Sequence, residues 1–218
     1  MDRGGNDLAR RALERAAGQW MDPGRGARYA AVRWRRRAAR DPRAVARLLA
    51  QHTRPGAVVV DVPAGSARLA AAIAQDGRHW IGFDVSAAML AAVPAPRTGH
   101  IAIARAERLP LGDHAADAVV CCRLLHHVHE PAARSLVLHE LARVARELVL
   151  VSFWDRAAWP SLRRAVAGGG QDRAGRAAIG RADFAAELDA AGLELIGFHA
   201  VLRFFSAQTF AIARPRRR

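Results

Sequence analysis

The chain has 218 residues and a formal net charge of +14, with 34 basic residues, 20 acids and two cysteines. This length suits one large domain that buries roughly 70% of its unfolded surface, so folding requires neither disulfides nor a structural metal. The cysteines, Cys121 and Cys122, are adjacent and would point to opposite faces of a strand, which argues against a disulfide between them. No signal-like segment and no apolar run of membrane length is found, so we expect a cytoplasmic protein without a transmembrane segment.

The positive charge is concentrated at the two ends of the chain. Residues 1–40 contain 11 Arg and 4 acids, and residues 156–218 contain 11 Arg and 5 acids. Residues 41–155 are nearly balanced, with 12 Arg and 11 acids. All 34 cations are arginine, a bias typical of GC-rich coding sequences, which explains the type of cation but not its distribution. Basic flanks could bind an anionic substrate, a nucleic acid or a membrane surface. They could equally be solvent-exposed helix faces that bind no partner.

In chain order, residues 1–40 predict one or two helices. Asp41-Pro42 predicts a helix start, with a capping acid followed by a proline in the first turn. The run from Val58 to Val62 is apolar on both faces and predicts a buried central strand. A helix is expected over residues 67–75. A second strand is expected from His79 to Asp84.

Later segments continue the alternation of strands and helices. Further strands are expected at His100 to Ile103, Ala116 to Cys122 and Leu148 to Phe153, and further helices after Ser86, from Pro131 and from Phe184 to Ala191. The glycines at 168–170 predict a mobile insertion at about residues 155–180. The runs Leu193 to Phe198 and Thr209 to Ala213 predict a closing antiparallel pair. We therefore predict an α/β protein with a doubly wound, mostly parallel seven-stranded sheet and helices on both faces.

The ends of the first two predicted strands carry the strongest functional signal. Asp61 ends the first strand, and a turn of small residues around Gly65 follows it. Asp84 ends the second strand, 19 residues after Gly65. A strand, a tight turn, a helix and a second strand with a terminal carboxylate form a nucleoside-binding half-site. The turn lets backbone N–H groups approach the ligand, and Asp84 is placed to accept hydrogen bonds from both ribose hydroxyls.

In this order of features, residues 41–213 resemble the class I S-adenosylmethionine-dependent methyltransferases, particularly the small-molecule, type 11-like branch. Four segments carry the resemblance: Asp61 to Ala67, Asp84 to Met89, Arg105-Ala106-Glu107, and Cys122 to His127. The resemblance implies a Rossmann-like fold with the last strand inserted antiparallel between the fifth and sixth, and S-adenosyl-L-methionine as the cofactor. The cofactor-binding residues that it implies are Asp61, Ala64, Gly65, Asp84, Val85, Met89, Ala106, Glu107 and Arg123.

The chain departs from the family pattern at three positions. Pro63 and Ala67 stand where the family has its first and third turn glycines, and Arg105 stands where it has an acid near the adenine. Proline removes a backbone donor and fixes φ, and alanine adds a methyl group where the backbone approaches the ligand. A non-catalytic cofactor-binding relative is therefore one alternative.

Three histidines, at positions 126, 127 and 129, follow the fourth predicted strand. We expect His127 to be the candidate catalytic base, because a histidine at a strand's carboxyl end can deprotonate a hydroxyl nucleophile. His126, Tyr29 and Trp154 are candidate substrate contacts. No metal is expected, because no nearby acid completes a helical zinc motif.

We predict methyl transfer to a small-molecule or lipid-like acceptor that is anionic or membrane-associated. The basic flanks suggest an RNA-modifying enzyme as an alternative, but Cys122-Arg123-Leu124-Leu125 stands where base-modifying relatives carry a polar-Pro-Pro-aromatic motif. A nicotinamide dehydrogenase is disfavoured by the missing G-x-G-x-x-G. The predicted organisation is a basic helical cap at 1–40, a methyltransferase domain at 41–213 and a basic tail at 214–218. The cap and the insertion would select the substrate.

Overall fold

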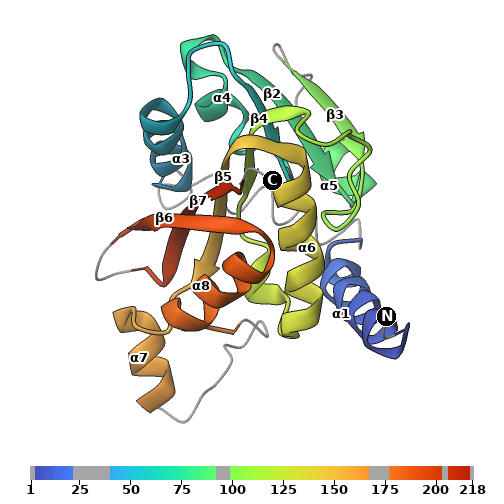
Figure 1. Cartoon of the computed structure of the whole chain (residues 1–218), viewed down its shortest axis with the longest axis vertical. Coiled ribbons are helices and arrows are strands. Elements are labelled where there is room, and N and C mark those ends of the chain that lie inside the picture. The colour runs from blue at the N-terminus through green and yellow to red at the C-terminus, as the bar shows by residue number, and fades with distance from the viewer. Residues whose placement is uncertain (1–2, 22–39, 92–98, 167–176, 203–205, 217–218) are drawn as a thin grey trace.

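The computed structural model describes residues 3–21, 40–91, 99–166, 177–202 and 206–216. A single seven-stranded sheet with the order β3-β2-β1-β4-β5-β7-β6 crosses the molecule (Figure 1). The strands are β1 (Val58–Asp61), β2 (His79–Asp84), β3 (His100–Ile103), β4 (Ala116–Cys121), β5 (Ala145–Trp154), β6 (Leu193–Ala200) and β7 (Gln208–Pro215). The first five are parallel, and β7 lies antiparallel between β5 and β6. The sheet is therefore mixed, with β7 as its one antiparallel strand among the described residues, next to the edge strand β6.

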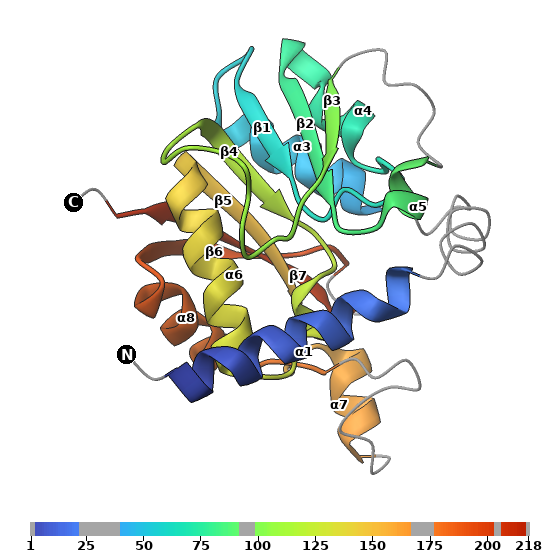
Figure 2. The same cartoon turned by 90° about the vertical axis from the view of Figure 1, so that its right-hand side faces the viewer.

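Helices cover both faces of the sheet. They are α1 (Arg3–Met21), α3 (Arg40–His52), α4 (Ala70–Ile73), α5 (Ala87–Ala91), α6 (Pro131–Val144), α7 (Trp159–Val166) and α8 (Arg181–Ala190). Helices α3 and α4 pack on one face, while α6, α8 and α1 pack on the other (Figures 1 and 2). Helix α1 runs against α6 and reaches α5, so the N-terminal segment lies beside strand ends that are distant in sequence.

Alternation along the central strands supplies both cores. Val59 packs into the core beneath α3, and its neighbour Val60 packs into the core beneath α6, because successive strand residues point to opposite faces. Cys121 and Cys122 divide in the same way, and both are buried free thiols. Since β1 has β2 on one side and β4 on the other, the strand order reverses at β1. This reversal places a ligand-binding crevice at the carboxyl ends of these strands.

Several predicted boundaries differ from the structure. The helix expected over 67–75 is limited to α4, followed by a 3₁₀ turn at Gln75–Gly77. Ala67 adopts a left-handed φ of 54°, so the helix cannot begin there. The predicted tail begins too early, since β7 continues to Pro215 and pairs Arg214 with Glu194. Within the predicted insertion, α7 is an ordered helix. Residues 22–39, including Tyr29, and the glycines at 168–170 lie outside the described residues.

Candidate functional site

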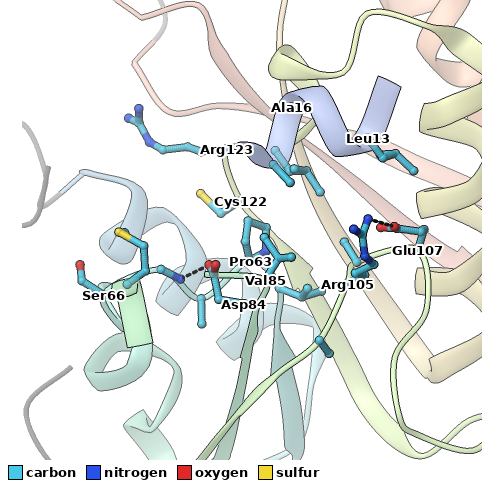
Figure 3. A pocket seen from close by; sticks show the side chains of 18 of the residues that line it. Leu13, Ala16, Pro63, Ser66, Asp84, Val85, Arg105, Glu107, Cys122 and Arg123 are labelled. Carbon is cyan, nitrogen blue, oxygen red and sulfur yellow. Dashed lines mark hydrogen bonds and ion pairs between the residues drawn. The ribbon is translucent and has the colours of Figure 1, made fainter. Parts of the chain in front are cut away.

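A pocket enclosing about 970 Å³ of empty space, including its open mouth, lies at the carboxyl ends of β1, β2 and β4. Its walls come from the turns that follow β1 to β4 and from α1 (Figure 3). The lining residues are Leu13, Ala16, Ala17, Val62, Pro63, Ala64, Gly65, Ser66, Arg68, Asp84, Val85, Met89, Ala104, Arg105, Ala106, Glu107, Cys122, Arg123 and Leu124. Apart from a few charged side chains, this lining is apolar, as small-molecule sites usually are.

Asp84 connects the two segments that the sequence singles out. Its Oδ2 accepts a hydrogen bond from the N–H of Gly65 at 2.8 Å, and its Oδ1 accepts one from the N–H of Ser86 at 2.8 Å. The residue is only 5% exposed, and burial raises the pKa of its carboxyl, while these backbone hydrogen bonds oppose the shift. A carboxylate has about four acceptor positions, so these two hydrogen bonds leave it able to accept more. A diol is the ligand group that matches two adjacent acceptors.

The turn after β1 requires a glycine at position 65. Gly65 has φ +57°, and a Cβ there would lie 3.3 Å from Cε of Met89. A side chain would therefore strain the backbone and push Met89 into the pocket. Ala67 also adopts a left-handed φ of 54°, and its N–H donates to the carbonyl of Ala64 at 3.0 Å. The turn thus keeps a closed shape although two of its positions depart from the glycine-rich pattern.

Asp61 does not line the pocket, and the prediction for it is an indirect role, in which it orients the turn and acts on the amino-acid part of the cofactor. Its side chain is fully buried, and Oδ2 accepts a hydrogen bond from Nε1 of Trp80 at 3.3 Å. Oδ1 has no hydrogen-bond partner in the described part of the chain. The pKa of this carboxyl is raised from 3.8 to about 7. Burial is the largest cause, the hydrogen bond from Trp80 and the charge of Arg68 oppose it, and the charge of Asp84 adds to it. Asp61 is therefore a buried acid outside the pocket lining, and its indirect role stays a prediction.

Helix α1, from the predicted N-terminal cap, supplies a pocket wall, although the sequence did not identify which of its residues line the pocket. Leu13 and Ala16 lie on the side of the segment after β3, where Arg105 pairs with Glu107 at 3.2 Å (Figure 3), and Ala17 also lines the pocket. Arg105 also lies 3.9 Å from Glu14 on α1, so ionic contacts join the helix to this wall. Helical periodicity identifies the buried face of α1 but gives no sign of which strand ends it meets.

The predicted residues after β4 divide into two groups. Arg123 lines the pocket, whereas His126, His127 and Trp154 do not. His126 is 1% exposed and stacks on Trp154, with ring centroids 5.1 Å apart and planes at 18°, and its ring centroid lies 4.4 Å from that of His127. The 3₁₀ turn at Leu125–His127 carries these rings toward the end of β5 rather than toward the pocket. Within the described residues, no group of three His, Cys, Asp or Glu side chains has a geometry suited to a metal ion.

The other predicted cofactor residues meet at the pocket. Ala64 and Gly65 come from the β1 turn, Val85 and Met89 from the segment after β2, and Ala106 with Glu107 from the segment after β3. Ser86 immediately precedes α5, and its Oγ accepts a hydrogen bond from the N–H of Met89 at 3.3 Å, as a helix-capping serine does. Together with Arg123 after β4, the segments that follow four strands thus meet at one concave site.

Comparisons with known proteins agree with this geometry. The family model described as "Methyltransferase domain" matches residues 60–151, which include the turns after β1 to β4. Among solved structures, the magnesium protoporphyrin IX methyltransferase from Synechocystis with bound S-adenosylmethionine has a TM-score of 0.69 at 17% identity, covering 94% of this chain and 97% of that one. No curated protein matches the chain.

Two further solved structures have similar scores. A putative methyltransferase from Haloferax volcanii, in complex with the activator Trm112, has a TM-score of 0.68 at 14% identity, covering 93% of this chain and 98% of that one. A possible histamine N-methyltransferase from Thermotoga maritima has a TM-score of 0.67 at 16% identity, with coverages of 92% and 100%. At these identities, the likenesses show a shared fold. No helix among the described residues is long and apolar enough to span a membrane.

Proposed function

Since this chain is a class I S-adenosylmethionine-dependent methyltransferase, we propose that it methylates a small-molecule or lipid-like acceptor at the pocket below α1. The observation that carries the proposal is the position of Asp84, which lies in the pocket wall with its carboxylate bonded to the N–H of Gly65. The nucleoside of the cofactor would lie over these two residues.

The residues present fit this cofactor. Asp84 is able to accept further hydrogen bonds from the ribose hydroxyls, and Gly65 leaves the turn open to a close approach. We propose that the adenine lies toward Ala106 and Glu107, against the apolar residues of α1. The amino-acid end would then extend past the β1 turn toward β4. In this arrangement Val85 and Met89 contact the nucleoside.

When bound, S-adenosylmethionine supplies an electrophilic methyl group on a sulfonium that is its own leaving group. The task of the chain is to align the acceptor with that methyl and to exclude water. Leu13 and Ala16 would cover the site from above, and the turns after β1 and β4 would fix the direction of approach. Because the described lining contains no histidine, we propose that alignment supplies most of the rate enhancement.

The apolar lining favours a small-molecule or lipid-like acceptor. The RNA-modifying alternative is supported by the net charge of +14 and by the fold shared with a Trm112-partnered putative methyltransferase. Base-modifying relatives use a polar-Pro-Pro-aromatic motif after the fourth strand, and this chain has Cys122-Arg123-Leu124-Leu125 there. We therefore favour the small-molecule acceptor.

The test incubates the protein with S-adenosylmethionine labelled on its methyl group and two acceptor pools, a small-molecule and lipid extract and a purified tRNA pool. We expect label in the solvent-extractable products. Label in acid-precipitable RNA would transfer the assignment to RNA. Calorimetry with S-adenosylhomocysteine provides the binding control, since binding without transfer to either pool would indicate a non-catalytic relative.

A further inference from the structure

Helix α7 turns large apolar side chains toward solvent. Trp159 is 58% exposed and Leu162 is 44% exposed, whereas Ser161 is only 5% exposed. We propose that α7 and the turn before it dock the protein on the surface of an anionic lipid bilayer. This inference goes beyond the proposed function, because it concerns a surface outside the pocket and the partner that this surface fits. The surface, called the α7 surface below, consists of Arg156, Trp159, Leu162 and Arg163.

The orientation of α7 is the reverse of that of an ordinary surface helix. An amphipathic helix packed on a protein core turns its apolar residues inward and its polar residues outward. Trp159 and Leu162 are three positions apart and therefore lie on one face of the helix, which here is the solvent face. Single exposed apolar residues are common on protein surfaces, but a tryptophan beside a leucine forms a patch that a partner can cover.

A buried acid fixes the start of α7, so this exposure is a property of the fold. Asp155 is 1% exposed, and its Oδ1 accepts a hydrogen bond from the N–H of Ala157 at 2.9 Å. Its Oδ2 accepts one from Nε of Arg181 on α8 at 2.7 Å. The N–H of Arg156 also donates to the carbonyl of Ile179 at 2.9 Å. These hydrogen bonds tie the turn before α7 to the segment that leads into α8.

The charge around the two apolar side chains is positive. Residues 156–181 contain six Arg and one acid. Arg163 is exposed next to Leu162. Arg156 is exposed as well, and its contact with Asp183 at 3.4 Å is a surface ion pair that contributes little and that lipid phosphates can replace. Tryptophan and leucine beside arginine are typical of helices that lie in the headgroup region of an anionic membrane.

The α7 surface lies at the same end of the sheet as the pocket. Strands β4 and β5 are parallel neighbours, so their carboxyl ends lie at one edge of the sheet. The pocket is at the end of β4, and α7 follows the end of β5. Figure 2 shows α7 beyond the ends to which these two strands point. A bilayer that contacts α7 would therefore present a lipid-like acceptor at the end of the molecule that contains the pocket.

The apolar part of the α7 surface favours a bilayer over RNA as the partner. A tryptophan beside arginines can also stack on an unpaired base, and arginines can contact phosphates of either partner. Leu162, however, has no π face on which a base could stack. The acyl boundary of a bilayer buries both Trp159 and Leu162, so it accounts for the whole patch.

The first arm of the test measures cosedimentation of the full chain with vesicles of phosphatidylcholine, either pure or with about 30% phosphatidylglycerol. We expect wild type to bind the anionic vesicles about tenfold or more tightly than the neutral ones, because arginines near the surface add attraction. Trp159→Ala/Leu162→Ala should bind the anionic vesicles about tenfold or more weakly than wild type, since this variant buries less apolar surface. Ile103→Ala is the matched control and should bind like wild type, because Ile103 is 63% exposed on the distant edge strand β3.

The second arm tests the charge of the α7 surface. Arg156→Gln/Arg163→Gln should bind the anionic vesicles about tenfold more weakly than wild type and the neutral vesicles equally. Arg43→Gln/Arg47→Gln, which replaces two exposed arginines of α3, is the control and should stay within about threefold of wild type. Raising the salt from about 0.1 M to about 1 M should weaken binding to the anionic vesicles, because it screens the attraction.

Three further results would overturn the inference. They are equal binding of wild type to neutral and anionic vesicles, binding to neither, and an equal loss in the Ile103→Ala control. A tRNA gel shift that is lost in Trp159→Ala/Leu162→Ala would assign the α7 surface to RNA instead. A change of oligomeric state in that variant would assign the surface to a second copy of the chain.

Thermal unfolding shows whether each variant folds, and Trp159→Ala alone replaces the double variant if the latter does not fold. Calorimetry with S-adenosylhomocysteine is carried out on the same wild-type protein without vesicles. Failure to bind that ligand would contradict the proposed function, whereas failure to bind anionic vesicles would contradict only the docking surface. The two failures are thus distinguishable.

Discussion

The neighbouring strands β1 and β2 both end in aspartate, yet the two carboxylates have different surroundings. Asp84 lies in the pocket wall and accepts two backbone hydrogen bonds at 2.8 Å. Asp61 lies beneath the pocket and accepts a single hydrogen bond from Trp80 at 3.3 Å. Burial raises the pKa of both carboxyls, but backbone donors oppose the shift at Asp84, whereas Asp61 has no such donors within the described residues and its pKa is raised to about 7. The position of an acid at a strand end is therefore insufficient to assign it to a ligand.

This difference separates a binding role from a structural one. Asp84 can accept further hydrogen bonds from a ligand that enters the pocket. Asp61 is outside the pocket lining, and we expect it to influence the site only through the shape of the β1 turn. Substitutions at the two positions should therefore change different quantities, ligand affinity at Asp84 and pH-dependent stability at Asp61.

Replacing Asp84 should produce the largest effect on affinity. Asp84→Asn keeps the shape of the side chain but removes the charge, and a hydrogen bond to a charged acceptor is worth about 1.5–3 kcal/mol. We expect S-adenosylhomocysteine to bind about ten- to a hundredfold more weakly, measured by calorimetry. Glu147→Gln, at an exposed acid on β5, is the control. Unchanged affinity in Asp84→Asn would remove the basis for placing the ribose at this carboxylate.

Replacing Asp61 should change stability rather than affinity. Because its folded pKa is about 7 and its ordinary value is 3.8, the folded state holds the proton more tightly than the unfolded state. Stability from this group is therefore present at low pH and is lost as the pH rises from about 4 to about 7. Asp61→Asn cannot ionise, so it removes that loss of stability. Its new amide donors lack a partner and offset part of the effect, so we expect the free energy of unfolding to rise by about 1–2 kcal/mol at pH 8.

Urea denaturation of wild type and Asp61→Asn at pH 5 and pH 8 measures this difference. The gain should shrink toward pH 5, while the affinity for S-adenosylhomocysteine stays within about threefold of wild type. A stability difference independent of pH would show that Asp61 does not titrate in this range. A large loss of affinity would instead place Asp61 among the ligand-binding residues.

The turn that joins the two strand ends can be tested at Gly65. A Cβ at φ +57°, close to Met89, should cost about 1–2 kcal/mol in Gly65→Ala, since left-handed backbone is unfavourable for residues with a side chain. Gly112→Ala is the matched control, because open space surrounds that position and its φ is not in the left-handed region. Equal losses of unfolding free energy in the two variants would show that the turn is not constrained.

His127 should have the smallest effect on turnover. Its ring lies outside the pocket lining, so His127→Gln is expected to lower kcat by less than about threefold, whereas loss of a general base costs about 10²–10⁴-fold. The measurement uses the acceptor identified by the labelled-methyl assay. A loss of a hundredfold or more would restore the prediction that His127 is the base.

The sequence was informative where local chemistry determines the outcome. Apolar β-branched runs located the central strands, and the Gly65–Asp84 spacing located the pocket, because both signals lie within one strand–turn–strand unit. Long-range contacts were not predictable in this way. Asp41 looks like a helix cap, yet its partners Arg68 and Arg123 are 27 and 82 residues away. Leu13 on α1 could not be assigned to the pocket for the same reason.

A crystal structure with S-adenosylhomocysteine bound tests the location of the cofactor most directly. We predict that both ribose hydroxyls lie within hydrogen-bonding distance of the Asp84 carboxylate, with the nucleoside against the turn at Gly65. A nucleoside bound elsewhere on the chain, or a ribose that makes no contact with Asp84, would contradict the assignment of this pocket.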